Sequence, residues 1–151
     1  LVLEATSASV SARNKFLFGT FANLYDESGG SSSWFLNLFF WLFHPSFFEK
    51  SSVVEAAVDL SVSYSYNPSR AAFRRQIECI GAFMAGDLAA IHIPVLVMAG
   101  SHDLVFDSKC ATGLAAEIPH AKLVVVEGAG HALHVDQFSE FMRQLRSFIE
   151  F

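Results

Sequence analysis

The stretch VVVEGAGHALHVDQF, residues 124–138, places a strand, a turn and the start of a helix in direct succession. Apolar residues lead into a turn made of Gly128, Ala129 and Gly130, and the turn ends on His131. An apolar run without polar alternation is typical of a strand that is buried on both faces of a parallel sheet. His131 is therefore expected at the carboxyl end of a buried strand.

A second stretch of the same kind is IPVLVMAGSHDLVF, residues 93–106, in which the turn carries Asp103. The residues between the two stretches predict a helix that is capped by Asp107 or Ser108 and stops before Pro119. A third apolar run opens the chain. The predicted strands are Leu1 to Ala5, Pro94 to Ala99 and Leu123 to Val126. The sequence thus predicts an α/β fold with a mostly parallel sheet.

An amphipathic helix is predicted to close the chain, with Asp136 placed to cap its start. Its apolar residues recur at spacings of three and four: Phe138, Phe141, Met142, Leu145 and Phe148.

Residues 8–86 contain no convincing strand and are predicted to be helical. Their apolar stripes are Leu17, Phe21 and Leu24; the run from Trp34 to Phe43; and Phe73, Ile77, Ile80 and Met84 behind a start signal at Asn67 and Pro68. We therefore divide the chain into a core strand (1–7), a helical block (8–86) and a C-terminal α/β segment (87–151).

Composition excludes several classes of function. Apolar residues make up 52% of the 151 residues, and a net charge of −5 without a basic cluster argues against nucleic-acid and anionic-membrane partners. The apolar run at 34–48 is too short to cross a bilayer and contains Asn37 and Pro45, so no transmembrane segment is expected. Cys79 and Cys110 lack metal-site spacing and are expected to be free buried thiols. Free thiols are typical of a reducing compartment, so a cytoplasmic location is expected, and LVLEAT shows no leader pattern.

The two strand-and-turn stretches together resemble the last third of the α/β-hydrolase fold. In that family a G-x-x-D turn carries the acid of a catalytic triad, here Gly100 to Asp103, and a later G-x-G-H turn carries the general base, here Gly128 to His131. The resemblance implies that LVLEATSAS is the sixth strand and that the helical block is an inserted lid. It implies a partial α/β-hydrolase fold. The sequence departs from the family pattern at Asp107 and Phe138, where proline is common.

Simple chemistry explains why the two turns belong together. The carboxyl ends of neighbouring parallel strands form the edge where ligand sites of open α/β sheets collect. A histidine there accepts and returns a proton near neutral pH, and an aspartate fixes its tautomer. Asp103 and His131 are therefore predicted to be a catalytic pair within hydrogen-bond reach.

Other roles for residues near the pair remain open. Asp103 and His131 are, individually, also common turn residues, and Glu4 is an alternative acid. His134 and His102 are expected to be a lid or turn contact and a solvated neighbour.

The nucleophile of the family stands in a G-x-S-x-G turn, and no such motif occurs in these 151 residues. We expect the serine to lie outside this chain, in an N-terminal half that is supplied separately. The substrate is predicted to be a small apolar ester, lactone or related carbonyl compound, in contact with lid residues Trp34, Phe35, Leu38, Trp41 and Phe47. No cofactor or metal is expected, because histidines and cysteines show no ligand spacing.

Two hypotheses of function follow. The first is the C-terminal part of a lidded serine hydrolase that is inactive by itself. The alternative is a non-catalytic hydrolase remnant that acts as a binding or dimerising module. Both predict an exposed sheet edge at Leu1 to Ala5, which would pair with an N-terminal half or with a second copy.

Overall fold

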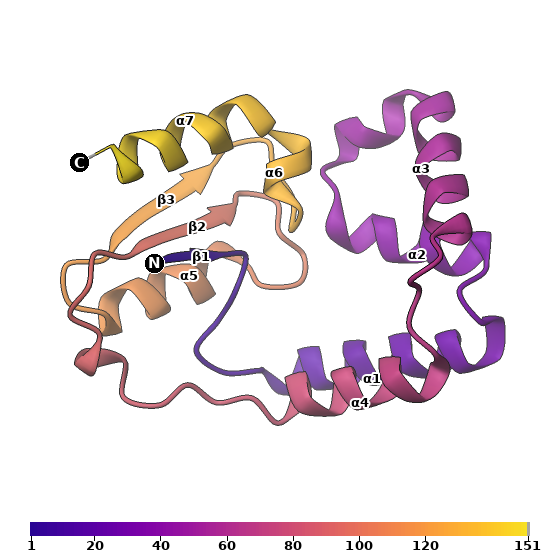
Figure 1. The fold of residues 1–151 in the computed structure, drawn as a ribbon, viewed down its shortest axis with the longest axis horizontal. Coiled ribbons are helices and arrows are strands. Elements are labelled where there is room, and N and C mark those ends of the chain that lie inside the picture. The colour runs from indigo at the N-terminus through magenta and orange to yellow at the C-terminus, as the bar shows by residue number, and fades with distance from the viewer. Residues whose placement is uncertain (151) are drawn as a thin grey trace. The chain divides into compact units, whose positions relative to one another are not determined.

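The structure is a computed structural model that describes residues 1–150 (Figure 1). The chain forms two compact units. The first contains Leu1–Ala8, Trp41–His44 and the residues from Ala85 onward, and the second contains Ser9–Phe40 and Pro45–Met84. Three separate segments of the chain therefore make up the first unit. Among the described residues, no helix is long and apolar enough to cross a membrane.

The first unit is built on a parallel sheet of β1 (Val2–Glu4), β2 (Leu96–Gly100) and β3 (Lys122–Val126). The strand order is β1-β2-β3, so β2 is central, and all pairings are parallel. The three strands lie where the apolar runs predicted them. The predicted α/β class with a parallel sheet is confirmed.

Strand β2 is buried on both faces, which explains its uninterrupted apolar sequence. One face of β2 packs against α5 (Ser108–Glu117). The other face packs on the side that α7 (Phe138–Ile149) covers, as Figure 1 shows. The buried residues of the α5 side are Val95, Val97, Ala99, Ala111, Leu114 and Ile118. Those of the α7 side are Leu96, Met98, Val126, Ala129 and Leu133. The sheet is thus the middle of three layers.

Of the two helix caps predicted for this unit, one is confirmed and one is wrong. Asp107 caps α5 as predicted, since its Oδ1 accepts the N–H groups of Lys109 and Cys110, each at 3.1 Å. Asp136 does not cap α7. It ends a short helix, α6 (Leu133–Asp136), and its carboxylate turns back toward the histidine turn. Gln137 occupies the cap position of α7 without a capping side-chain bond.

The second unit is helical, as its stripes predicted. Its elements are α1 (Ala12–Ser28), most of α2 (Ser32–Leu42), the 3-10 helix η1 (Pro45–Glu49), α3 (Ser51–Ser63) and α4 (Arg70–Gly81). The stripes did not predict α3, of which only Val58 is buried. Helix α4 is capped by Ser69, just after the signal at Asn67 and Pro68, and ends before Met84. Met84 is 78% exposed and lies beyond the end of α4, so its inclusion in the predicted helical stripe was wrong.

Aromatic rings form the core of the helical unit. Trp34 packs edge-on against Tyr25 and Phe73, with ring centroids 4.8 and 5.5 Å away. Its indole N–H donates to the carbonyl of Phe21 at 3.3 Å. An ion pair between Arg74 of α4 and Asp26 of α1 joins these helices at the surface. The richness in phenylalanine thus serves packing here.

Gly100 ends β2 at a point where two turns meet. A Cβ atom on Gly100 would lie 2.1 Å from the carbonyl oxygen of Gly130 and 2.4 Å from that of Ala129. The turns are joined here by backbone bonds from Ser101 N to Val126 O at 3.0 Å and from His102 N to Ala129 O at 2.8 Å. A side chain at residue 100 would push these backbones apart.

We predict that Gly100→Ala lowers the free energy of unfolding by about 1–3 kcal/mol, because rigid backbone cannot yield as a side chain can. Gly113→Ala is the matched control. Gly113 is exposed within α5 and a Cβ there meets nothing within 4 Å, so this change should stabilise by about 0.5–1 kcal/mol. Urea denaturation measures both, and equal effects of the two changes would refute the close-approach argument.

Candidate active site

Asp103 is held in place through both of its carboxylate oxygens. Oδ1 accepts the backbone N–H groups of Val105 and Phe106 at 2.7 and 2.9 Å, and Oδ2 faces the ring of His131. The Asp103 side chain is 0% exposed. Burial of a carboxylate is costly unless its oxygens are hydrogen-bonded, and here they are. The turn after β2 therefore builds a fixed acceptor.

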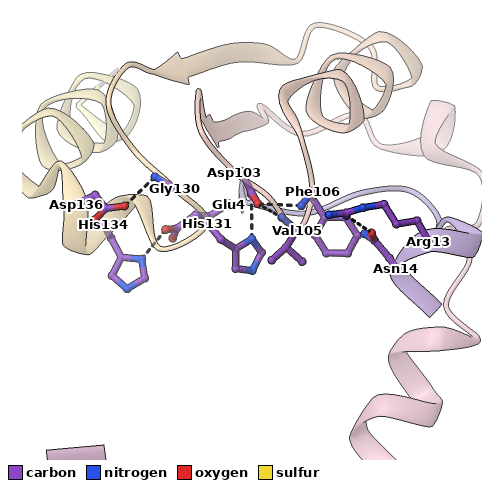
Figure 2. A network of polar contacts seen from close by, with 10 residues as sticks. All are labelled: Glu4, Arg13, Asn14, Asp103, Val105, Phe106, Gly130, His131, His134 and Asp136. Carbon is purple, nitrogen blue, oxygen red and sulfur yellow. Dashed lines mark hydrogen bonds and ion pairs between the residues drawn. The ribbon is translucent and has the colours of Figure 1, made fainter. Parts of the chain in front are cut away.

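His131 completes the pair from the turn after β3. Its Nδ1 lies 2.9 Å from Asp103 Oδ2, and its side chain is 25% exposed (Figure 2). The ring of Phe106 lies beside it, with centroids 6.0 Å apart. The predicted contact between the two residues is confirmed. Nδ1 faces the carboxylate, so Nε2 is the ring nitrogen that is left to act on another molecule.

Glu4 makes a separate pair with His134. Glu4 Oε1 lies 2.6 Å from His134 Nδ1, and Figure 2 shows this pair beside the first. The Glu4 and His134 side chains are 27% and 52% exposed, so this pair is more open to water. Glu4 thus contacts His134 and not His131. The geometry gives no support to Glu4 as an alternative acid.

His102 is exposed, in agreement with the expectation of a solvated neighbour, and it also has contacts within the protein. Its Nδ1 lies 2.8 Å from Ser101 Oγ, and the His44 ring packs edge-on against it at 4.5 Å. Ser101 Oγ also accepts the N–H of Gly128 at 3.0 Å. Ser101 and His102 therefore join the acid turn to the base turn.

The lid residues named as substrate contacts have different surroundings within the structure. Trp34 and Phe35 are buried in the helical unit, with ring centroids 4.9 Å apart, so packing alone accounts for them. Phe47 packs against Phe39 in the same unit. Leu38 and Trp41 are half-buried.

The Cys110 thiol is not activated, and the described residues offer no metal site. Burial raises the pKa of the Cys110 thiol, a hydrogen bond to Ser7 lowers it, and the charges of Asp107 and Asp103 raise it further. A raised pKa leaves little thiolate for attack. Cys79 is exposed and Cys110 half-buried, so the expectation that both are buried was wrong. Within residues 1–150, no three His, Cys, Asp or Glu side chains gather in a way that could hold a metal ion.

The described residues thus form a parallel α/β sheet with a carboxylate–imidazole pair at its carboxyl edge. A family model described as the alpha/beta hydrolase fold matches residues 49–138. This chain belongs to the alpha/beta hydrolase fold family. The resemblance noted from the sequence is thus confirmed.

Related proteins extend this finding. Over 76 residues the chain is 33% identical to a candidate carbamate hydrolase, RutD, of Pseudomonas syringae pv. syringae (strain B728a). The matched region covers 50% of this chain and 29% of that protein. An alpha/beta hydrolase from a Medee basin deep-sea metagenome library superposes with a TM-score of 0.84 at 17% identity, over 99% of this chain and 55% of its own. The enol-lactonase of Burkholderia xenovorans LB400 gives 0.83 at 20% identity, again over 99% and 55%.

The chain spans about half the length of these solved structures, in agreement with the prediction of a partial α/β-hydrolase fold. At such identities the structures establish the fold alone.

Three parts of the site were missed by sequence reasoning. They are the carboxylate of Asp136 on the histidine turn, the Ser101 bridge between the turns, and the ring of Phe106 beside His131. Asp136 was singled out from the sequence, but as a helix cap and not as an acceptor for the histidine turn. The other two depend on contacts between segments far apart in the sequence and had no local signal.

We predict a low-field proton resonance from His131 Nδ1–H that is held by the Asp103 carboxylate. Asp103→Asn should abolish this signal because the amide cannot act as the same charged acceptor. Glu4→Gln is the matched control and should leave it in place, since Glu4 pairs with His134. Proton NMR across neutral pH measures the signal. Its survival in Asp103→Asn would contradict the assigned contact.

Proposed function

We propose that this chain contributes the acid and the base of a serine hydrolase, with Asp103 as the acid and His131 as the general base. The observation that carries the proposal is the 2.9 Å contact between the two side chains at the ends of adjacent strands. Both oxygens of the acid are engaged, which fixes the direction in which the carboxylate points. This is the arrangement that orients an imidazole for proton transfer.

The chemistry assigned to His131 is acyl transfer. A serine hydroxyl from residues outside this chain gives its proton to His131 Nε2 as its oxygen attacks the substrate carbonyl carbon. The imidazolium then protonates the departing alcohol, and an acyl-enzyme remains. Water attacks that ester with His131 again as base, which releases the acid and regenerates the serine. Asp103 keeps Nδ1 protonated throughout and stabilises the imidazolium.

The substrate class that we propose is a small apolar ester, lactone or related carbonyl compound. Support comes from the partly exposed aromatic and aliphatic residues of the helical unit, among them Leu38 and Phe47, and from relatives that are named as an enol-lactonase and as esterases. We propose that the helical unit acts as a lid over this site.

We also propose that β1 pairs on its open side with a strand of the hydrolase's N-terminal half. Within residues 1–150, β1 pairs only with β2, so one side of Val2–Glu4 carries unmatched backbone groups. Such an edge is a template for strand addition. Pairing with a second copy of the chain, as a binding or dimerising module, is the competing outcome.

In the complete hydrolase, His131→Ala should lower kcat/KM for p-nitrophenyl acetate by about 10³-fold or more, with Asp103→Asn close behind. His92→Ala is the control, because His92 is an exposed histidine outside both turns and should change little. Stopped-flow or plate assays measure the ratio. A fully active His131→Ala enzyme would end the assignment.

The 151-residue chain alone should be inert toward a fluorophosphonate probe, because it contains no G-x-S-x-G serine. Adding the N-terminal half should restore labelling on that half. Intact-mass spectrometry reads both results. Stoichiometric labelling of a serine within this chain would contradict the proposed location of the nucleophile.

The open edge makes a separate prediction for the isolated chain. Analytical ultracentrifugation at micromolar concentration should show self-association. Association with the N-terminal half in preference to itself would favour the hydrolase over the dimerising module. A well-folded monomer would count against both forms of edge pairing.

A further inference from the structure

The carboxylate of Asp136 holds two separate segments of backbone through one oxygen atom. Oδ2 accepts the N–H of Gly130 at 2.8 Å and the N–H of His44 at 2.9 Å. Gly130 directly precedes His131, and Asp136 follows it at the end of α6. The carboxylate thus links the residue before the proposed base to the end of α6. Figure 2 shows its bond to Gly130.

The segment Trp41–His44 is the other partner of this contact, and we call it the strap. Leu42 O accepts the N–H of Ala132 at 2.9 Å, so the strap contacts the chain on both sides of His131. A Cβ on Gly130 would lie 2.7 Å from Leu42 O and 2.9 Å from His44 N, which shows that the backbones touch. Gly130 is therefore required for close packing.

The strap also reaches the turn that carries the acid. The His44 ring packs edge-on against that of His102, with centroids 4.5 Å apart, and His102 directly precedes Asp103. One short segment therefore contacts both turns. Its backbone N–H at His44 is held by Asp136 and its side chain lies against the acid turn.

We propose that Asp136 is a positioning residue that sets the place of His131 by holding the base turn and the strap on a single carboxylate oxygen. The proposal rests on the proposed function, because it assigns Asp136 a role in orienting the general base. A carboxylate forms stronger bonds to backbone N–H groups than a neutral acceptor does. Without Asp136 two N–H groups lose their acceptor, and the peptide before His131 loses the hydrogen bond that fixes its N–H. A displacement of about 1 Å at a catalytic group costs on the order of 10²-fold in rate.

Two substitutions separate the geometry from the charge. In the complete hydrolase, Asp136→Ala should lower kcat for p-nitrophenyl acetate by about 10²-fold with KM little changed, because the base is misplaced while substrate contacts remain. Asp136→Asn keeps an oxygen for both N–H groups and should cost less than about tenfold. Asp87→Asn is the control, since Asp87 Oδ1 accepts one backbone N–H, that of Ala89, in the connection before β2. It should leave kcat unchanged.

The second readout is the low-field proton of His131 Nδ1–H. It should shift or vanish in Asp136→Ala, persist in Asp136→Asn and be unchanged in Asp87→Asn. An Asp136→Ala enzyme that keeps both kcat and the resonance would overturn the proposal, as would one that loses only thermal stability. If Asp136→Ala does not fold, the folded Asp136→Asn variant decides the question. Large losses of both kcat and the resonance in Asp136→Asn would overturn the claim that an acceptor oxygen at this place is what positions His131.

The two proposals fail in different ways. A complete protein without esterase activity would refute the proposed function, and the proton resonance would still decide whether Asp136 positions His131.

Discussion

The absence of a side chain at Gly100 is the constraint on which the site depends. The carbonyl oxygens of Ala129 and Gly130 occupy the space where a Cβ would stand. This close approach lets Ser101 and His102 bond across to the base turn. The separation of 2.9 Å between the acid and the base is a consequence of backbone contact and does not rely on long, flexible side chains.

Carboxylates fix the rest of the geometry, each by serving more than one partner. Asp103 joins its own turn to His131, and Asp136 joins the base turn to the strap. A carboxylate that is shared in this way leaves the backbone few alternative conformations. If one N–H donor moves away with the carboxylate, the other N–H is left without a hydrogen-bond partner. Under the proposed function this rigidity has a chemical purpose, since the imidazole must stay aligned while its charge changes.

Much of this could be predicted from the sequence because the deciding signals are local. The apolar run of β2 indicated burial on both faces, and the two turns after β2 and β3 indicated the pair at one sheet edge. Asp136 was assigned to a helix cap because its spacing to Phe138 fitted that role equally well. The bond from His44 N decides between the roles, and it joins residues far apart in the chain. Helix α3 was not predicted because its sequence shows no clear apolar stripe, and only Val58 is buried.

The two carboxylate–imidazole pairs at this edge show why proximity alone does not define an acid. Glu4 and Asp103 each lie within hydrogen-bond distance of a histidine, at 2.6 and 2.9 Å. Asp103 is shut off from water and held by two N–H groups, so its interaction with the imidazole is screened little. The Glu4 pair is partly exposed, and pairs in that environment contribute little energy and impose little order. The environment of the carboxylate, more than the distance, therefore distinguishes Asp103 from Glu4 and supports Asp103 as the proposed acid.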